Sequence, residues 1–279
     1  MNSRLEEITK KIVGNIHEVI VEYQINDTEL MQALNFLTEV GERGEYQLLS
    51  DVLGISVLVD EITHGQEETA KTAHNVEGPL YRPNAPKMGS KAKICSDGDK
   101  GDRLILTGQV LSAENNLPLA HALVDIWQAD EKGDYENQDE NQADYNLRGL
   151  IETDEEGRFT IETVIPGPYE IAKAGPIGGF LEAIGRHDWR PGHIHFKVSH
   201  ESCSPLTTML FVPNDPWIDS DAIGAVRDSL IMKFEKIDAP EELTKYNVDE
   251  PFFLCKYDFI LNTIENEKIE AKDEALQIK

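Results

Sequence analysis

Apolar side chains recur every three or four residues between Arg4 and about Thr72. Two series with this period are Ile8, Ile12, Val13, Ile16 and Ile20, followed by Leu30, Leu34, Leu37 and Val40. The period predicts amphipathic helices, because it places the apolar positions on one helix face. Asn26 and Asp27 precede the second series and supply a polar cap. A third apolar run, LLSDVLGISVLVDEI, is too long for one strand and predicts a third helix.

Three helices of this length enclose little interior of their own. Their apolar faces therefore need cover from the rest of the chain, from a second subunit or from an apolar ligand such as a lipid. Dimerisation is the simplest arrangement. We expect a homodimer formed through the N-terminal helices, with bound lipid as a further occupant of the helical unit.

The pattern changes after a segment rich in Pro, Gly and Lys that runs from Glu77 to Asp102 and has no sustained period. Short alternating or β-branched runs follow, namely LILTGQVL, HALVDIWQ, GLIETD, GRFTIETV, HIHFKVS and TTMLFV. Turn residues separate them, which is typical of an antiparallel sandwich or barrel. A further helix is predicted from Asp221 to about Lys236, and PFFLCKYDFIL predicts one last strand.

The fold class predicted from these patterns is mainly β with α, consisting of an antiparallel β-sandwich and an N-terminal helical unit. We divide the chain into a helical dimerisation domain (1–76), an ordered linker (77–102), a sandwich domain (103–263) and a charged tail (264–279). The linker assignment follows from its Pro and Gly content.

Acidic residues outnumber basic ones by 52 to 26, and the formal net charge is −26. Such a surface repels phosphate backbones and anionic headgroups, so neither nucleic acid nor a membrane is an expected partner. The charge is explained by solubility alone. Cys95, Cys203 and Cys255 form no CxxC pair, and the first residues contain no apolar leader. We therefore expect reduced thiols in a cytoplasmic protein.

The candidate chemistry begins with His193 and His195 in an alternating run. Side chains two positions apart on a strand emerge on the same face, so both imidazoles can reach one metal ion. An HxH pair alone is weak evidence, since two histidines can also be ordinary structural residues. Trp189 and Arg190 precede the pair on a turn set by Pro191 and Gly192. This crowding favours a functional site.

Two tyrosines stand out as further ligands. Tyr135 follows Gly-Asp in a polar loop, and Tyr169 ends the turn IPGPY. Each tyrosine by itself is explained by packing with a hydrogen-bonded hydroxyl. A cation can remove the proton of a phenol held against it, and hard anionic phenolates suit ferric iron better than zinc.

The order of Gly-x-Tyr135, NLRG, a D-x-x-G turn, P-x-P-Tyr169 and GRHxWRPxHxHF resembles the intradiol ring-cleavage dioxygenases. The resemblance extends over nearly the whole chain. It implies one non-haem Fe(III) per subunit, held by Tyr135, Tyr169, His193 and His195. It also implies a small aromatic diol or triol and O2 as the substrates.

The resemblance assigns further roles. Tyr169 would also act as a base for a substrate proton, and Arg190 would stabilise negative charge that develops on the ring. A salt bridge is the alternative role for Arg190. The positions that match the family's pocket are Val76, Gly78, Pro79, Leu80, Ile171 and Arg190, together with Asp60 in SVLVD.

Asp60 resembles an aspartate of the hydroxyquinol-cleaving branch, where a carboxylate can accept a hydrogen bond from a third ring hydroxyl. A solvated helix carboxylate is the alternative. Segments such as DSDAIGAVRDSLI are similar to that branch, and Met209 stands where the catechol branch usually has glutamine. We predict cleavage of hydroxyquinol (benzene-1,2,4-triol) to 3-hydroxy-cis,cis-muconate or maleylacetate. Catechol 1,2-dioxygenase activity giving cis,cis-muconate is the alternative.

Two other classes compete with this interpretation. A transthyretin-like sandwich could bind ligands without metal chemistry. A zinc hydrolase could be built on HxH but would need a carboxylate or a third histidine in its site. Both would be colourless, whereas ferric tyrosinate absorbs visible light.

Overall fold

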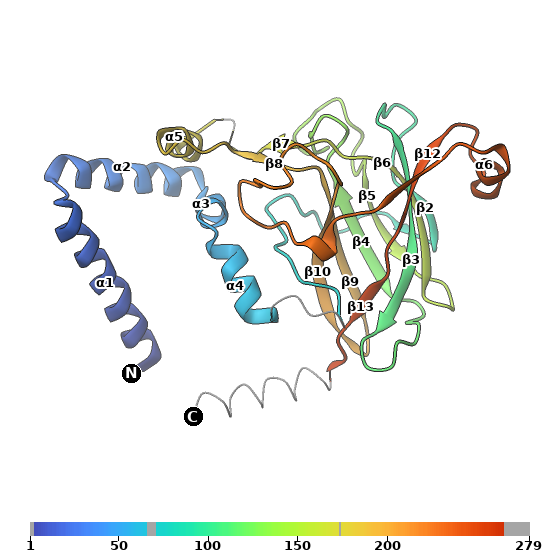
Figure 1. Cartoon of the computed structure of the whole chain (residues 1–279), viewed down its shortest axis with the longest axis horizontal. Coiled ribbons are helices and arrows are strands. Elements are labelled where there is room, and N and C mark those ends of the chain that lie inside the picture. Colours follow the sequence, from blue (N-terminus) through green and yellow to red (C-terminus); the bar gives the residue numbers. More distant parts are fainter. Residues whose placement is uncertain (1–2, 66–70, 173, 265–279) are drawn as a thin grey trace.

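The structure is a computed structural model that describes residues 3–65, 71–172 and 174–264. Its N-terminal part is an arm of four helices that projects from a β-sandwich (Figure 1). The helices are α1 (Ser3–Tyr23), α2 (Asp27–Arg43), α3 (Tyr46–Val52) and α4 (Ile55–His64). The single helix expected from the third apolar run is thus two short helices, because the chain turns at Leu53 and Gly54.

The start of α2 follows the sequence prediction. The Asn26 side chain accepts hydrogen bonds from the backbone of Thr28 and Glu29, and the Glu29 carboxylate accepts one from the Asn26 backbone. This reciprocal cap satisfies N–H groups that have no partner inside the helix.

Two main sheets form the sandwich. The first contains, in spatial order, β1 (Lys87–Met88), β5 (Arg148–Glu152), β4 (Leu123–Gln128), β9 (His193–His200) and β10 (Cys203–Phe211). The second contains β11 (Phe234–Ile237), β12 (Phe252–Lys256), β3 (Arg103–Ser112), β6 (Arg158–Val164) and β2 (Lys91–Lys93), and β13 (Phe259–Leu261) also pairs with β3. A separate ribbon joins β7 (Tyr169–Glu170) to β8 (Trp189–Arg190).

The main core lies between the two sheets. Leu104, Leu106 and Val110 of β3 meet Ile194 and Phe196 of β9 in one buried cluster. These core positions alternate along their strands with side chains that point to the opposite face of the same sheet. The period-two pattern in the sequence therefore specifies the sandwich.

The sheets are mixed, which corrects the prediction of a purely antiparallel sandwich. The pairs β1 with β5, β2 with β6, β12 with β3 and β13 with β3 are parallel. Alternation along a strand reports which face is buried but not the direction of the neighbouring strand. The segment predicted as a linker contributes β1 and β2, and the last predicted strand is interrupted between β12 and β13.

The helix predicted from Asp221 to Lys236 is wrong. This segment is a partly buried loop with one 3-10 turn (Asp228–Leu230), and it leads into β11. Two helices outside the arm are α5 (Pro176–Ala183) and α6 (Pro240–Tyr246). α5 packs against the arm, where Ile177 and Leu181 share a small core with Val40 of α2 and Val52 of α3.

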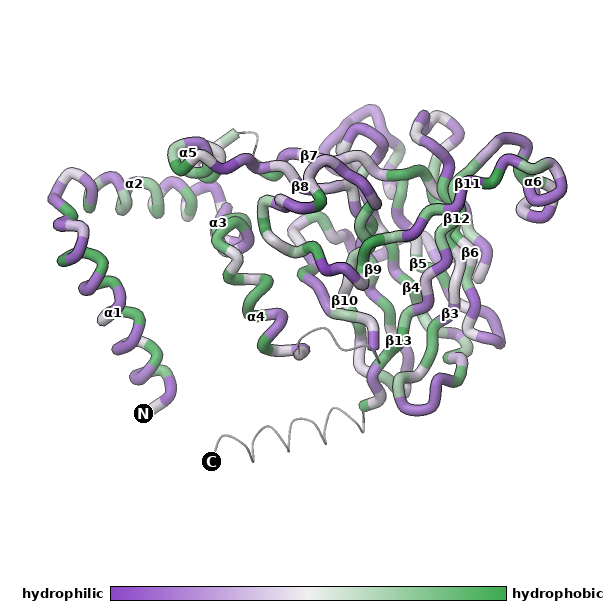
Figure 2. The backbone as a smooth tube through the Cα atoms, viewed as in Figure 1, coloured by the Kyte–Doolittle hydropathy of each residue, from purple (hydrophilic) through white to green (hydrophobic). Residues whose placement is uncertain are grey.

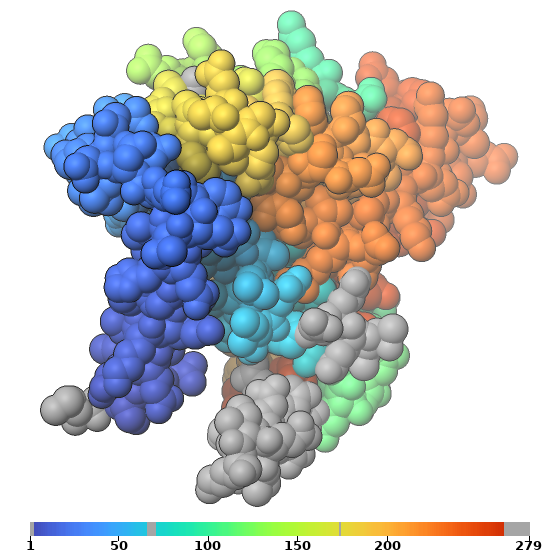
Figure 3. Space-filling view, turned by 60° about the vertical axis from the view of Figure 1, so that its left-hand side comes forward, coloured from blue at the N-terminus to red at the C-terminus, as the bar shows by residue number. Residues whose placement is uncertain are grey.

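The outer part of the arm keeps its apolar side uncovered. No residue of α1 is buried, and hydrophobic positions recur along α1 and α2 in Figure 2. In the space-filling view α1 extends away from the body below α2 (Figure 3). No helix of the described part is long and apolar enough to cross a membrane. The predicted tail lies outside the described residues from 265 onward.

Candidate metal centre and active site

His193 and His195 leave the same face of β9, while Ile194 and Phe196 between and after them enter the core. The two Nε2 atoms are 3.1 Å apart. His193 Nδ1 lies 2.8 Å from the carbonyl oxygen of Pro191. A carbonyl only accepts, so His193 Nδ1 carries the proton and Nε2 presents its lone pair to the site.

The neighbouring strand fixes the second imidazole. Trp127 of β4 pairs in register with His195, and the two rings stack with centroids 4.8 Å apart. His195 Nδ1 is buried and has no hydrogen-bond partner among the described residues. Packing against the indole therefore helps to orient this ring.

Two separate segments bring the tyrosines to the same place. Tyr135 lies in the loop after β4, and Tyr169 begins β7. Their rings meet edge to face with centroids 5.6 Å apart, and Tyr169 Oη is 3.5 Å from His193 Nε2. Gly133 allows this approach, because a Cβ there would lie 2.4 Å from the Pro168 carbonyl oxygen and φ is +89°.

Burial determines the protonation of these four groups. It raises the pKa of Tyr135 well above its ordinary value, and the adjacent Tyr169 raises it further. Burial also raises the pKa of Tyr169, although Arg190 acts in the opposite direction. The pKa of His193 is lowered well below its ordinary value by burial and then by Arg190, and that of His195 by burial and then by His193. Both imidazoles are therefore neutral and can act as ligands.

This cluster fits a metal ion. The Nε2 atoms of two neutral imidazoles lie 3.1 Å apart, and the buried Tyr135 hydroxyl, next to Tyr169, has no hydrogen-bond partner within the described chain. A buried polar atom without a partner is costly. A highly charged cation would satisfy it and would stabilise both phenols as phenolates, which suits hard ions such as ferric iron.

Arg190 is fixed beside the cluster. Its Nε and Nη2 atoms donate to the two carboxylate oxygens of Asp221 at 2.9 and 3.1 Å, and both side chains are buried. Nη1 lies 3.2 Å from His193 Nε2, and the pairing of β7 with β8 sets Arg190 opposite Tyr169. Burial alone would lower the pKa of Arg190, but Asp221 raises it, so the guanidinium stays charged.

A cavity of about 350 Å³ opens on this cluster. Tyr169, His195 and Arg190 form part of its wall. The other predicted pocket residues that line it are Val76, Gly78, Pro79, Leu80 and Ile171. The size and the mixture of apolar walls with polar and charged groups suit a small ligand that carries polar substituents.

The structure places Asp60 elsewhere. Its carboxylate binds Arg227 at 3.2 Å and His64 at 3.0 Å, and Asp60 does not line the cavity. The helix carboxylate that lines it is Asp51, at the end of α3 and only 4% exposed. Sequence reasoning missed Asp51, although it lies in the same apolar run, because the face it occupies depends on the turn between α3 and α4.

Two family models match the chain. One is described as "Dioxygenase" and covers residues 76–262, and the other as "Catechol dioxygenase N terminus" and covers residues 2–71. The hydroxyquinol 1,2-dioxygenase of Rhizobium sp. (strain MTP-10005) is 38% identical over 92% of this chain and 89% of its own length.

Solved structures agree with this result. Hydroxyquinol 1,2-dioxygenase from Pseudomonas putida DLL-E4 superposes with a TM-score of 0.86 at 34% identity, over 94% of this chain and 93% of that one. Catechol 1,2-dioxygenase from Acinetobacter radioresistens gives a TM-score of 0.84 at 29% identity, over 94% and 87%.

The fold and its relatives define a ring-cleaving dioxygenase. The chain belongs to the intradiol ring-cleavage dioxygenase family, which contains hydroxyquinol and catechol 1,2-dioxygenases. The resemblance seen in the sequence motifs is thereby confirmed.

Proposed function

We propose that this enzyme holds one non-haem Fe(III) through Tyr135, Tyr169, His193 and His195, and that it cleaves hydroxyquinol between its adjacent hydroxyl carbons. The observation that carries the proposal is the convergence of the buried Tyr135 phenol, the partly buried Tyr169 phenol and two neutral imidazoles beside the cavity. Ferric iron would bind the two adjacent substrate oxygens and draw electron density from the ring, which makes a ring carbon open to attack by dioxygen.

The residues around the cavity would bind and orient the ring. Tyr169 lines the cavity, so its oxygen can take a proton from a substrate hydroxyl. The Arg190 guanidinium also lines it and offers a fixed positive charge where the ring becomes negative. Val76, Pro79 and Ile171 supply apolar walls that keep water from the ring.

Asp51 supports hydroxyquinol over catechol as the preferred substrate. A buried carboxylate in the cavity wall can accept a hydrogen bond from the third hydroxyl, and catechol lacks this group. The relatives named as hydroxyquinol enzymes support the same choice. The product would be 3-hydroxy-cis,cis-muconate, or maleylacetate, and both atoms of O2 would be incorporated into it. Catechol cleavage to cis,cis-muconate is the second candidate, favoured by relatives of that name.

We also propose the domain division given above, with a dimerisation unit in residues 1–76, a pocket-lining linker in 77–102 and a catalytic unit in 103–263. The uncovered apolar side of α1 supports the first assignment. The cavity contacts of Gly78, Pro79 and Leu80 support the second.

The proposal is tested on iron-loaded protein with hydroxyquinol, catechol and 18O2. We expect a coloured protein, O2 uptake and a product that contains both labelled atoms. The double variant Tyr135→Phe, Tyr169→Phe should lose the visible band and nearly all turnover. Tyr81→Phe is the matched control, because this tyrosine packs in the same aromatic cluster but its hydroxyl donates to Asp125. Full turnover in the double variant, or a colourless active protein, would overturn the assignment.

A further inference from the structure

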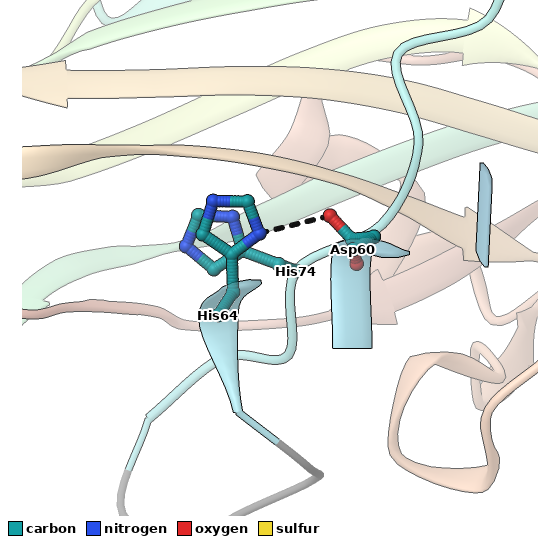
Figure 4. A group of neighbouring side chains, drawn as sticks. All are labelled: Asp60, His64 and His74. Atoms are coloured by element: carbon teal, nitrogen blue, oxygen red, sulfur yellow. Dashed lines mark hydrogen bonds and ion pairs between the residues drawn. The ribbon is translucent and has the colours of Figure 1, made fainter. Parts of the chain in front are cut away.

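A second group of metal-ligating side chains lies at the end of α4. Asp60 and His64 are one helical turn apart, and His74 comes from the segment that follows α4 (Figure 4). One ligand atom from each residue lies within 4.8 Å of the others. His64 Nδ1 is 3.0 Å from Asp60 Oδ1, and the two imidazoles stack with centroids 3.9 Å apart.

The backbone around this group is firmly held. Thr208 of β10 donates its hydroxyl to the Ala73 carbonyl at 2.7 Å, and the Asn75 N–H donates to the Thr207 carbonyl at 2.9 Å. Arg227 binds the second oxygen of Asp60 from the loop before β11. Three parts of the chain therefore meet here: α4 with the nearby stretch around His74, strand β10, and the loop that carries Arg227.

The protonation of His74 suits metal binding. Burial lowers its pKa to about 4, and the nearby charges of His64, Lys71 and Arg227 act in the same direction. A neutral imidazole is the form that a metal ion binds. Asp60 supplies a carboxylate beside it, and Glu61 adds a second negative charge 3.8 Å from Arg227.

We propose that Asp60, His64 and His74 form a second cation site, separate from the tyrosine and histidine cluster, and that it takes a divalent ion of the zinc class. Two imidazoles and one carboxylate, completed by water, are a common zinc ligand set. Ligand atoms around tetrahedral zinc are roughly 3.4 Å apart, given bonds of about 2.0–2.1 Å. The group must therefore contract on binding.

His64 is the residue whose side chain would move when the ion binds. Parallel stacked rings direct their lone pairs side by side, so one imidazole must turn to share an ion with the other. The His64 side chain is 37% exposed at the last turn of α4 and can do so, while His74 stays in place. Asp60 Oδ1 then exchanges the His64 hydrogen bond for the ion. Arg227 remains on Oδ2, where it fixes the carboxylate from outside, as outer partners of metal ligands do.

An ion at this place would tie the arm to the cavity wall. His74 is two residues from Val76, and Arg227 lies in the same loop as Ile223; both Val76 and Ile223 line the cavity. Binding would therefore stabilise the junction between α4 and the sandwich, since an ion that binds only the folded state raises its stability. The ion would not contact the substrate.

The test uses iron-loaded enzyme equilibrated with Zn²⁺ and then dialysed, with zinc and iron measured together. We expect about one zinc per chain with unchanged iron content and a rise in Tm. X-ray absorption spectra at the zinc edge should show two imidazoles and an oxygen ligand. His64→Gln and His74→Gln should each weaken zinc binding at least roughly tenfold and abolish the rise in Tm.

His121→Gln is the matched control. This exposed histidine also has carboxylates beside it, with Glu152 at 3.0 Å and Glu155 at 3.4 Å, but no second histidine. It should keep wild-type zinc binding. Equal zinc uptake by wild type and both His variants, zinc uptake accompanied by loss of iron, or no zinc uptake by wild type would each overturn the proposal. Because the readouts are stoichiometry and stability, failure of the proposed ring cleavage would not affect them.

Discussion

Asp51 and Asp60 occupy similar contexts in the sequence, each at the polar end of an apolar stretch, but they face different environments. Asp51 closes α3 and lines the cavity, where Gln47 donates to its carboxylate at 3.1 Å. Asp60 lies on α4 and pairs with Arg227. The turn between the two helices separates them, and nothing in the periodicity reveals how far it rotates the second helix.

Asp51→Leu should reduce kcat/KM for hydroxyquinol much more than for catechol. The third hydroxyl would lose its acceptor in a buried wall, and such a loss costs on the order of 10- to 100-fold. Steady-state O2 uptake with both substrates measures the ratio.

Asp60→Leu serves as the control for this experiment. It removes a carboxylate from the neighbouring helix but not from the cavity, so any loss should be the same for both substrates. A specificity change caused by Asp60→Leu and not by Asp51→Leu would restore the original assignment to Asp60.

Asp221 is a positioning residue for Arg190, because it accepts two hydrogen bonds from the guanidinium and also one from the Ala225 N–H at 3.0 Å. Asp221→Asn should lower kcat on the order of 10- to 100-fold with a smaller change in KM, since Arg190 would lose its fixed orientation during charge development. Asp221→Glu should restore part of the loss.

Asp228→Asn is the matched control for Asp221, because it lies in the same segment but is exposed. Circular dichroism and thermal unfolding check that each variant is folded. If Asp221→Asn lowers Tm along with kcat, and Asp221→Glu recovers none of the lost kcat, the role of Asp221 is purely structural.

At the scale of elements, Asp221 also explains why the predicted helix is absent. Ile223, Val226 and Leu230 have helical spacing, which agrees with the predicted helix. In the structure the Asp221 carboxylate accepts from the Ala225 backbone and pairs with Arg190, which commits the segment to a turn. A contact with a distant strand thus decides the local conformation, and periodicity cannot report it.

The interruption between β12 and β13 has a similar origin at Gly108 of β3. The Tyr257 carbonyl passes over Gly108, so a Cβ there would lie 1.8 Å from it. The Gln109 N–H donates to Asp258 Oδ1 at 2.8 Å, which replaces the ladder bond lost at this point. The sequence run reads as one strand because the close approach involves a residue far away in the chain.

Gly108→Ala should therefore destabilise the protein by about 2 kcal/mol or more, because the methyl group must displace backbone rather than a flexible side chain. Urea unfolding measures the loss. Gly89→Ala is the control, since a Cβ at Gly89 meets nothing within 4 Å and should change stability little. Equal stabilities of the two variants would contradict the close approach.

At the scale of the whole molecule, the sequence predicted the division into a helical arm and a sandwich. The four proposed iron ligands could be proposed from the sequence because each lies in a short motif, and the motifs follow one another in the order typical of the family. The mixed strand directions and the packing of α5 against α2 could not be predicted from the sequence, since both depend on contacts between segments far apart. Local sequence patterns thus predict individual helices, strands and motifs, but they do not predict how these elements are placed relative to one another.

The uncovered apolar face of α1 predicts a dimer. The apolar positions on this face, each between 43% and 61% exposed, are Leu5, Ile8, Ile12, Ile16 and Val19. A continuous apolar stripe of this kind calls for a partner surface, and we expect a second copy of the chain to cover it. The isolated enzyme should then sediment with twice the 31.3 kDa mass of the chain.

Val19→Glu should convert this dimer to a monomer, because a carboxylate would be buried without a partner in the interface. Val21→Glu is the matched control, because it makes the same substitution two residues away. Val21 lies on the opposite face of the helix and is 76% exposed. Sedimentation velocity at several concentrations compares the two. If wild type is already monomeric and solvent extraction releases a lipid, the stripe is covered by lipid instead, and the expectation of a dimer is wrong.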